Sequence, residues 1–288
     1  MAHSATGTSK HGPLAAKVPE ITFLFWIIKL LTTAGGEATS DYLALHGNLV
    51  AGAVEVAIFM TAVIIQFSVR RYVAAAYWFL ALAIAIFGTG VADAMHLIIG
   101  IPYGGTTALW AFVLAVIFSV WYRSEGTLSI HSITTTRREL FYWATVFATF
   151  AFGTALGDFT ASVLHLGYLG SAVLFFVVIV LPAVAWRFGM NPIAAFWWAY
   201  VATRPLGASF ADYLSKPHDI SGLNYGDGPT AAVTLALIVV LVGYTAIARY
   251  DIQRPPAATR LGSAGRGDRG GAEVIRNVGI DPARDQLP

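Results

Sequence analysis

Four aspartates of this sequence recur at one position of an internal repeat, and they are the first candidates for chemistry. Each follows a tryptophan and a glycine in the pattern W-x9-G-x4-D, and the four are Asp41, Asp93, Asp158 and Asp212. Aspartate occurs at only six positions between residues 21 and 250. Because four of these six occupy the same repeat position, the chain contains tandem repeats of about 50 to 65 residues.

The acids lie in a strongly apolar chain, which limits what they can do. Of the 288 residues, 57% are hydrophobic and only 12% are charged, and the mean hydropathy is +0.66. This composition is typical of an integral membrane protein. The sequence has no cysteine, which excludes disulfides and thiolate metal sites. The net charge of +2 gives no indication of nucleic-acid binding.

Eight ionisable residues inside or at the edge of the apolar segments are candidate ligands for a substrate or a coupling ion. They are Lys29, Glu37, Asp41, Glu55, Asp93, Asp158, Arg204 and Asp212. An ionisable side chain within a membrane costs at least ~2.5–3.5 kcal/mol, so such residues mark ion pathways or paired sites. Lys29, Glu37 and Asp41 are spaced by multiples of four residues, which places them on one helix face. Helix faces that carry ionisable residues avoid lipid only by meeting at a shared centre. We therefore predict a central acidic site, in which Lys29 and Arg204 neutralise acids.

Two histidines follow repeat aspartates on their own segments. His96 is three residues after Asp93, and His165 is two helical turns after Asp158. Carboxylates and imidazoles without sulfur suit Mn, Fe(II), Zn or protons. The predicted ligands of a divalent metal ion are Asp93, His96, Asp158 and His165. An architectural alternative stays open, in which each repeat aspartate caps the turn that follows its helix.

Eight apolar segments must position these side chains. They cover residues 21–43, 48–69, 74–99, 106–123, 139–165, 168–187, 193–214 and 229–249, and each is near the ~20 residues that span a bilayer. Lipid offers no partners to backbone polar groups, so the segments are helices. We predict an all-α integral membrane protein with eight transmembrane helices from four parallel two-helix repeats, at about residues 19–71, 72–136, 137–189 and 190–250. The odd helices form the inside of a pseudo-fourfold or two-by-two bundle, the repeated glycines allow close helix approach, and the tryptophans serve as interfacial anchors and packing residues.

The basic residues predict the orientation of the bundle. The connections on one side carry Arg70, Arg71, Arg123, Arg137, Arg138 and Arg187, whereas the other side has only Lys216. By the positive-inside rule both termini are cytoplasmic. Residues 1–18 are predicted to be a cytoplasmic tail, and residues 251–288 a disordered cytoplasmic tail. On the outer side, only the connection at residues 215–228 is long enough to act as a lid.

Three stretches of the chain resemble recurring segments of a known family. They are PEITFLFWIIKLLTTAGGE, GDFTASVLHLGYL and TRPLGASFADYLSKP. The family is a bacterial inner-membrane family of four tandem two-helix repeats, each with a tryptophan, and it is named only for its repeat of unknown function. The resemblance covers about residues 18 to 250. It implies the bacterial inner membrane and the eight-helix layout, and it implies no particular activity.

The residues favour a secondary transporter or permease, with a divalent metal cation or protons as the small substrate. We expect no enzymatic activity, because the chain has no Walker A motif, no dinucleotide loop and no nucleophile elbow. One alternative is a haem- or other cofactor-binding redox protein with His96 and His165 as axial ligands. Another is a membrane enzyme with an Asp–His pair as acid and base. Apart from the lipid bilayer, the expected partner is a second copy of the chain, because the even helices offer faces for a homo-oligomer.

Overall fold

The computed structural model describes residues 17–253, and this part of the chain contains helices and no strand. Its eight long helices are α1 Phe23–Ala44, α2 Asn48–Ser68, α3 Ala74–Leu97, α4 Tyr103–Glu125, α5 Thr136–Asp158, α6 Gly167–Arg187, α7 Pro192–Ser215 and α8 Asp227–Ala248. Three short elements lie between them: η1 Ile130–Ser132, the π-helical turn η2 Phe159–Val163 and η3 His218–Ile220. The helix bounds agree within a few residues with the apolar segments, so the predicted all-α fold is confirmed.

Local sequence signals start several of these helices. Thr22 caps α1, because its hydroxyl oxygen accepts a hydrogen bond from the backbone N–H of Phe25 at 3.2 Å. Asn191 caps α7 in the same way by accepting from Ile193 at 2.8 Å, and Pro192 occupies the first helical position, where no N–H is needed. The residue types at these positions therefore determine where α1 and α7 begin.

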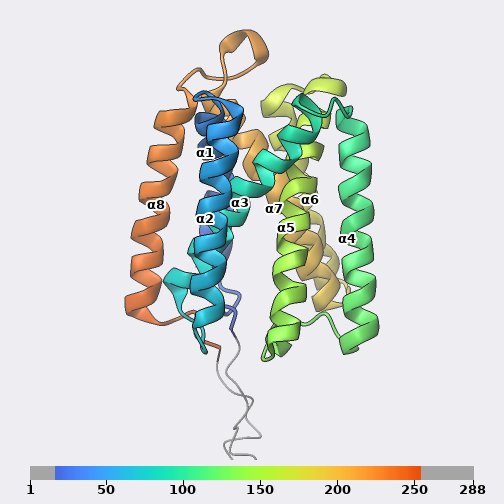
Figure 1. The fold of residues 1–288 in the computed structure, drawn as a ribbon. Helices are drawn as coiled ribbons and strands as arrows, with labels where there is room; N and C mark the ends of the chain where they lie inside the picture. Colours follow the sequence, from blue (N-terminus) through green and yellow to red (C-terminus); the bar gives the residue numbers. More distant parts are fainter. Residues whose placement is uncertain (1–16, 254–288) are drawn as a thin grey trace, which may run out of the picture. The chain divides into compact units, whose positions relative to one another are not determined.

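The four odd helices form a closed ring. α1 contacts α3, α3 contacts α5, α5 contacts α7, and α7 contacts α1. Each even helix packs outside the ring on the odd helix that comes next, with α2 on α3, α4 on α5, α6 on α7 and α8 on α1. In Figure 1, α8 and α4 stand at the two edges of the view. This is the predicted arrangement, in which the odd helices lie inside and the even helices outside.

The repeated glycines set the spacing of this ring. Each glycine packs against the residue three positions before the glycine of the next repeat: Gly36 on Ala85, Gly88 on Phe150, Gly153 on Arg204 and Gly207 on Thr33. A Cβ added at any of the four would lie 2.9 Å or less from its neighbour, closer than real Cβ atoms approach other heavy atoms. Because the same glycine contact occurs between each pair of neighbouring inner helices, the bundle is pseudo-fourfold rather than two-by-two.

Aromatic side chains fill the ring at the end opposite the aspartates. Trp78, Trp143 and Trp197 are buried, and the indole N–H of Trp197 donates to the carbonyl of Leu128 at 2.9 Å. The predicted packing role is confirmed for these three tryptophans, whereas their burial leaves no ring exposed for the predicted interfacial anchoring. The aromatic residue before each tryptophan meets its counterpart on a neighbouring inner helix, as Tyr77 meets Tyr142 and Phe25 meets Phe196.

Six of the eight helices are long and apolar enough to cross a membrane: α2, α3, α4, α5 with its π turn, α6 and α8. The other two, α1 and α7, carry charged residues that include Lys29, Glu37 and Arg204, all buried in the ring. The outward faces of the even helices are apolar and exposed, as lipid contact requires. These are the features of a multi-pass membrane protein.

The segments that flank the helices pack on the bundle, which corrects the predicted tail boundaries. Lys17 is buried, and its ammonium group donates to the Glu139 carboxylate at 2.7 Å, which also accepts from Gln66 at 2.9 Å. At the other end, Asp251 is buried and accepts from the Tyr72 hydroxyl. Residues 17–18 and 251–253 therefore belong to the folded part, because polar groups there find buried partners. The remainder of both predicted tails lies outside the described residues.

Candidate functional site

Arg204 of α7 lies at the centre of the ring with 0% of its surface exposed. Its guanidinium group donates to Glu37 Oε2 at 2.6 Å and to Thr154 Oγ1 at 2.6 Å, and it also donates to the Thr89 hydroxyl. These three acceptors come from α1, α5 and α3 and share one repeat position, immediately after the repeated glycine. The fourth residue at this position is Ala208, on the helix of Arg204 itself. One side chain thus ties all four inner helices together.

The pairing of Arg204 with Glu37 confirms that this arginine neutralises an acid of the centre. Two carbonyl oxygens also accept from the guanidinium, that of Thr33 from Nη1 at 3.0 Å and that of Phe150 from Nε at 3.3 Å. A buried ion pair is tolerated only when such additional hydrogen bonds offset the cost of removing both charges from water. The pair fills the axis at the level of the glycine contacts.

Lys29 of α1 lies on the aromatic side of this pair, and the prediction that it neutralises an acid is wrong. Only 1% of its surface is exposed, and its ammonium nitrogen has no hydrogen-bond partner within residues 17–253. It lies over the ring of Phe150 at 4.1 Å and over that of Tyr200 at 4.2 Å. Arg204 takes the available carboxylate, so Lys29 is left with cation–π contacts alone.

Replacing Lys29 with methionine is therefore expected to stabilise the protein by about 1 kcal/mol or more, because an apolar side chain of similar length removes a desolvated charge. Thermal unfolding of the detergent-purified protein measures the effect. Lys17→Met is the matched control, since it removes a buried lysine that does have a carboxylate partner, and it should lower the unfolding temperature. Equal losses in both variants would contradict the absence of a partner for Lys29.

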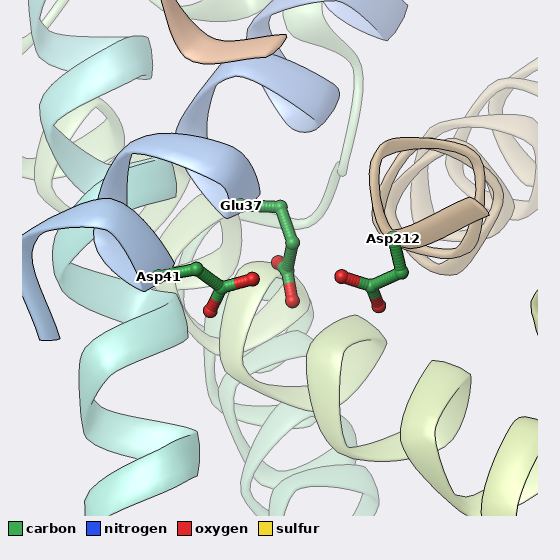
Figure 2. A group of neighbouring side chains, drawn as sticks. All are labelled: Glu37, Asp41 and Asp212. Atoms are coloured by element: carbon green, nitrogen blue, oxygen red, sulfur yellow. The ribbon is translucent and has the colours of Figure 1, made fainter. Parts of the chain in front are cut away.

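Three carboxylates converge beside the Arg204–Glu37 pair. Glu37 and Asp41 of α1 and Asp212 of α7 each offer an oxygen, and these oxygens all lie within 4.8 Å of one another (Figure 2). Glu37 and Asp212 are buried, whereas Asp41 is half-buried. Within the described part of the chain, the Asp212 carboxylate accepts no hydrogen bond, and Glu37 Oε1 is equally free. Carboxylate oxygens without imidazole or sulfur suit hard cations such as Mg²⁺, Ca²⁺ and Mn²⁺.

The other two repeat aspartates lie at the same ends of α3 and α5. Asp93 and Asp158 are half-buried, and neither carboxylate accepts a hydrogen bond from residues 17–253. The architectural alternative requires such bonds to the outer turns.

The predicted metal ligands on α3 and α5 are not brought together. Among residues 17–253 the one group of three acids or histidines close enough to hold a metal ion is that of Glu37, Asp41 and Asp212. His96 instead makes a hydrogen bond between its Nδ1 and the carbonyl of Ile101 at 2.8 Å, and its ring stacks on Tyr103 at 3.7 Å between centroids. His165 is exposed with a φ of 55°. The π-helical turn after Asp158 breaks the helical register on which the prediction for His165 depended.

Lys216, at the end of α7, holds the connection at residues 215–228 against the site. Its ammonium group donates to Asp41 Oδ2 at 2.7 Å and to Asp227 Oδ1 at 3.2 Å. Burial lowers the pKa of Lys216, but the charges of Asp41 and Asp212 outweigh burial and hold the pKa above its usual value. Lys216 is therefore charged at neutral pH. The sequence analysis used Lys216 only to predict the orientation of the helices. Its position as the single Lys or Arg in the predicted outer connections was a signal that it pairs with the acids there.

Glu55 of α2 also reaches the inner ring. Its side chain is buried between α1 and α3, and Oε1 accepts from the Ser40 hydroxyl at 2.7 Å. It lines a cavity of about 440 Å³ together with Asp41 and Asp93. Six of the eight candidate ligands thus form two neighbouring groups, whereas Lys29 and Asp158 belong to neither. One group is Arg204, Glu37, Asp41 and Asp212, and the other is Asp41, Glu55 and Asp93.

The chain matches one family model, described as Repeat of Unknown Function (DUF347), over residues 76–127, 141–189 and 195–250. The three stretches lie in the second, third and fourth predicted repeats. No curated protein and no solved structure matches the chain.

Proposed function

The chain belongs to the Repeat of Unknown Function (DUF347) family, and from its site we propose a secondary transporter that binds a divalent metal cation, protons or both at Glu37, Asp41 and Asp212. The observation that carries the proposal is the shared carboxylate of Glu37. This carboxylate belongs both to the acidic group and to the ion pair with Arg204 that fills the axis.

In this proposal all eight helices cross the membrane, including α1 and α7. These two have 22 and 24 residues, which at about 1.5 Å per residue gives roughly 33–36 Å, enough for the bilayer core. Their charged residues face the ring, so lipid does not contact them. The positive-inside rule places both termini in the cytoplasm and the aspartate end of the bundle outside, in the bacterial inner membrane.

The mechanism is an exchange of partners at Glu37. A cation that enters from the aspartate end takes the free oxygens of Asp212 and Glu37, and so weakens the attraction between Glu37 and Arg204. The Arg204 guanidinium then keeps only its hydrogen bonds to hydroxyl and carbonyl groups, so it can shift more easily relative to the other three inner helices. A ligand shifts such an equilibrium by its difference in affinity for the two arrangements.

The buried arginine argues against a simple cation channel, because a positive charge on the axis opposes cations. The haem alternative depended on His96 and His165. His96 lies in the last turn of α3 and bonds to the connection that follows, and His165 is exposed. No contact within the described residues favours that alternative, and the same holds for the membrane enzyme. We therefore keep transport as the proposed function.

Asp212→Asn is expected to weaken Mn²⁺ binding by more than about tenfold, because it removes a buried ligand that has no other partner. Isothermal titration calorimetry on the detergent-purified full chain measures this affinity. Asp219→Asn is the matched control, because it removes the same charge from an exposed outer turn, and it should bind Mn²⁺ as the wild type does.

A second measurement covers protons as the substrate. In proteoliposomes with a trapped pH-sensitive dye, the wild type and Asp219→Asn should carry protons down an imposed gradient, and Asp212→Asn should not. The proposed function fails if Asp212→Asn behaves as the wild type in both assays, or if the wild type shows neither Mn²⁺ binding nor proton flux.

A further inference from the structure

A cavity of about 440 Å³ lies beside the inner ring, between α1, α2 and α3. Its volume is within the range of small-molecule sites, which are mostly apolar with a few placed polar groups. The apolar wall includes Leu45, Leu97 and Ile98. The charged groups are the carboxylates of Asp41, Glu55, Asp93 and Asp227 and the ammonium group of Lys216, and Ser40 and Asn48 add neutral polar side chains.

Glu55 is the most informative of these groups. It is the single ionisable residue of α2, and only 4% of the Glu55 surface is exposed, whereas the opposite face of α2 is apolar and exposed. Its Oε1 accepts from Ser40, whereas Oε2 accepts no hydrogen bond within the described residues. Because Glu55 lines the cavity, this oxygen can accept a hydrogen bond from a ligand there.

Gly90 of α3 makes the space for this carboxylate. A Cβ at Gly90 would lie 1.9 Å from Glu55 Oε2. In the other three repeats the same position, two residues after the repeated glycine, holds Ala38, Ala155 and Ser209. Only the second repeat therefore has room for an acid from its neighbouring even helix, and Glu55 fills that room.

The arrangement of the carboxylates distinguishes between ligand classes. Among residues 17–253, Glu55, Asp93 and Asp227 belong to no group of three acids that could hold a metal ion. They line the cavity together with apolar side chains. A bare metal ion needs its ligands close together, whereas an organic cation with an apolar body fits charges that are spread apart.

The cavity already holds an ammonium group, that of Lys216, between Asp41 and Asp227. This side chain belongs to the connection after α7 and reaches the cavity from outside α1, α2 and α3. This contact shows that carboxylates lining the cavity can hold an ammonium group. An ammonium group donates three hydrogen bonds, and the carboxylates here accept them.

We propose that this cavity binds a small organic cation with a primary ammonium group, held by Glu55 and Asp93, and that Lys216 is a tethered competitor which this ligand displaces from Asp41. The inference deepens the proposed transporter by naming a substrate class, and it rests on that function for transport but not for binding. Asp41 belongs to both this cavity and the group with Glu37 and Asp212, which gives the two sites a physical link.

Calorimetry with n-hexylammonium chloride on the detergent-purified full chain tests the proposal. We expect saturable binding of one equivalent, and none of n-hexanol, which has the same apolar chain without the charge. Equal binding of both would overturn the proposal, since it would show only apolar contact. Absence of saturable hexylammonium binding to the wild type and to Lys216→Gln would overturn it as well.

Three variants locate the site. Glu55→Gln should weaken hexylammonium binding about tenfold or more, because a charge-assisted hydrogen bond is lost. Gly90→Ala should weaken it too, because the added Cβ displaces the Glu55 carboxylate while that residue keeps its charge. Lys216→Gln should tighten binding several-fold, since the tethered competitor is gone. If none of the three substitutions changes the affinity for hexylammonium, the proposal is overturned. If only Lys216→Gln leaves the affinity unchanged, the role of Lys216 as a competitor is overturned.

Two controls separate this inference from the proposed function. Asp219→Asn should bind hexylammonium as the wild type does, which excludes a general effect of net charge. Asp212→Asn should lose Mn²⁺ binding and keep hexylammonium binding, because Asp212 does not line the cavity. A wild-type protein that binds Mn²⁺ but not hexylammonium refutes the inference alone. A wild-type protein that binds hexylammonium but not Mn²⁺ refutes the proposed metal site alone. Circular dichroism and size-exclusion chromatography verify that each variant folds.

Discussion

Gly36→Ala is expected to lower the stability of the folded bundle by about 1–3 kcal/mol or more, the usual cost of overpacking a close contact. The added Cβ would lie 2.3 Å from Ala85 Cβ and 3.0 Å from the Ala85 carbonyl carbon. Neither atom belongs to the end of a flexible side chain, so the helices themselves must separate. At Gly207 the added Cβ would lie 1.8 Å from the Thr33 hydroxyl and 2.6 Å from Thr33 Cβ, which no side-chain rotation can move, so alanine there should cost a similar amount.

The control for this substitution is Gly243→Ala on α8. Gly243 is helical and exposed, and a Cβ there meets no atom within 4 Å. Alanine is the better helix former, so this variant should be as stable as the wild type or slightly more stable. Thermal unfolding in detergent compares the two. If Gly36→Ala unfolds at the same temperature as Gly243→Ala, α1 and α3 are not in close contact at this glycine and the ring is built differently.

Breaking the central ion pair is expected to have the larger effect. Arg204→Met leaves Glu37 as a buried carboxylate without its counter-charge, and removing one partner of such a pair costs about 3–5 kcal/mol. The same substitution removes the donor that connects α7 to Thr89 of α3 and Thr154 of α5. The contacts between all four neighbouring pairs of inner helices should therefore weaken.

A double-mutant cycle distinguishes the pair from its surroundings. Glu37→Gln keeps the shape of the side chain and removes its charge, and it should also destabilise the protein. In the double variant Glu37→Gln, Arg204→Met no charge is left unpaired, so its loss should be smaller than the sum of the single losses by about 0.5–3 kcal/mol. Chemical unfolding of the four proteins measures this coupling. Additive losses would mean that Arg204 and Glu37 do not interact in the folded protein.

Much of the fold could be predicted from the sequence because the membrane restricts the choices. A run of about 20 apolar residues must be a helix, since lipid offers no partner to its backbone. A helix with Lys29, Glu37 and Asp41 on one face must turn this face away from lipid. The repeat then requires the other odd helices to do the same, which leads to an inner ring of four.

The partners of individual side chains could not be predicted in this way. Arg204 and Lys29 are both buried cations near acids along the sequence, yet only Arg204 reaches Glu37. Helical periodicity gives the face of each residue, but the partner across the ring depends on the depth and rotation of two helices. The glycine contacts set both quantities, and they became visible only in the structure. His96 was mispredicted for a related reason, since its ring bonds to the connection after its own helix.

The sequence by itself determined the eight helices, their up-and-down order and the acidic character of the centre, because these follow from hydropathy and from the repeat. The tertiary structure decided which acids form a group. Glu37, Asp41 and Asp212 come from α1 and α7, and they meet because the ring closes between the first repeat and the last. Glu55 joins from outside the ring through the space left at Gly90. Such meetings depend on contacts between residues that are distant along the chain, which helical periodicity does not specify.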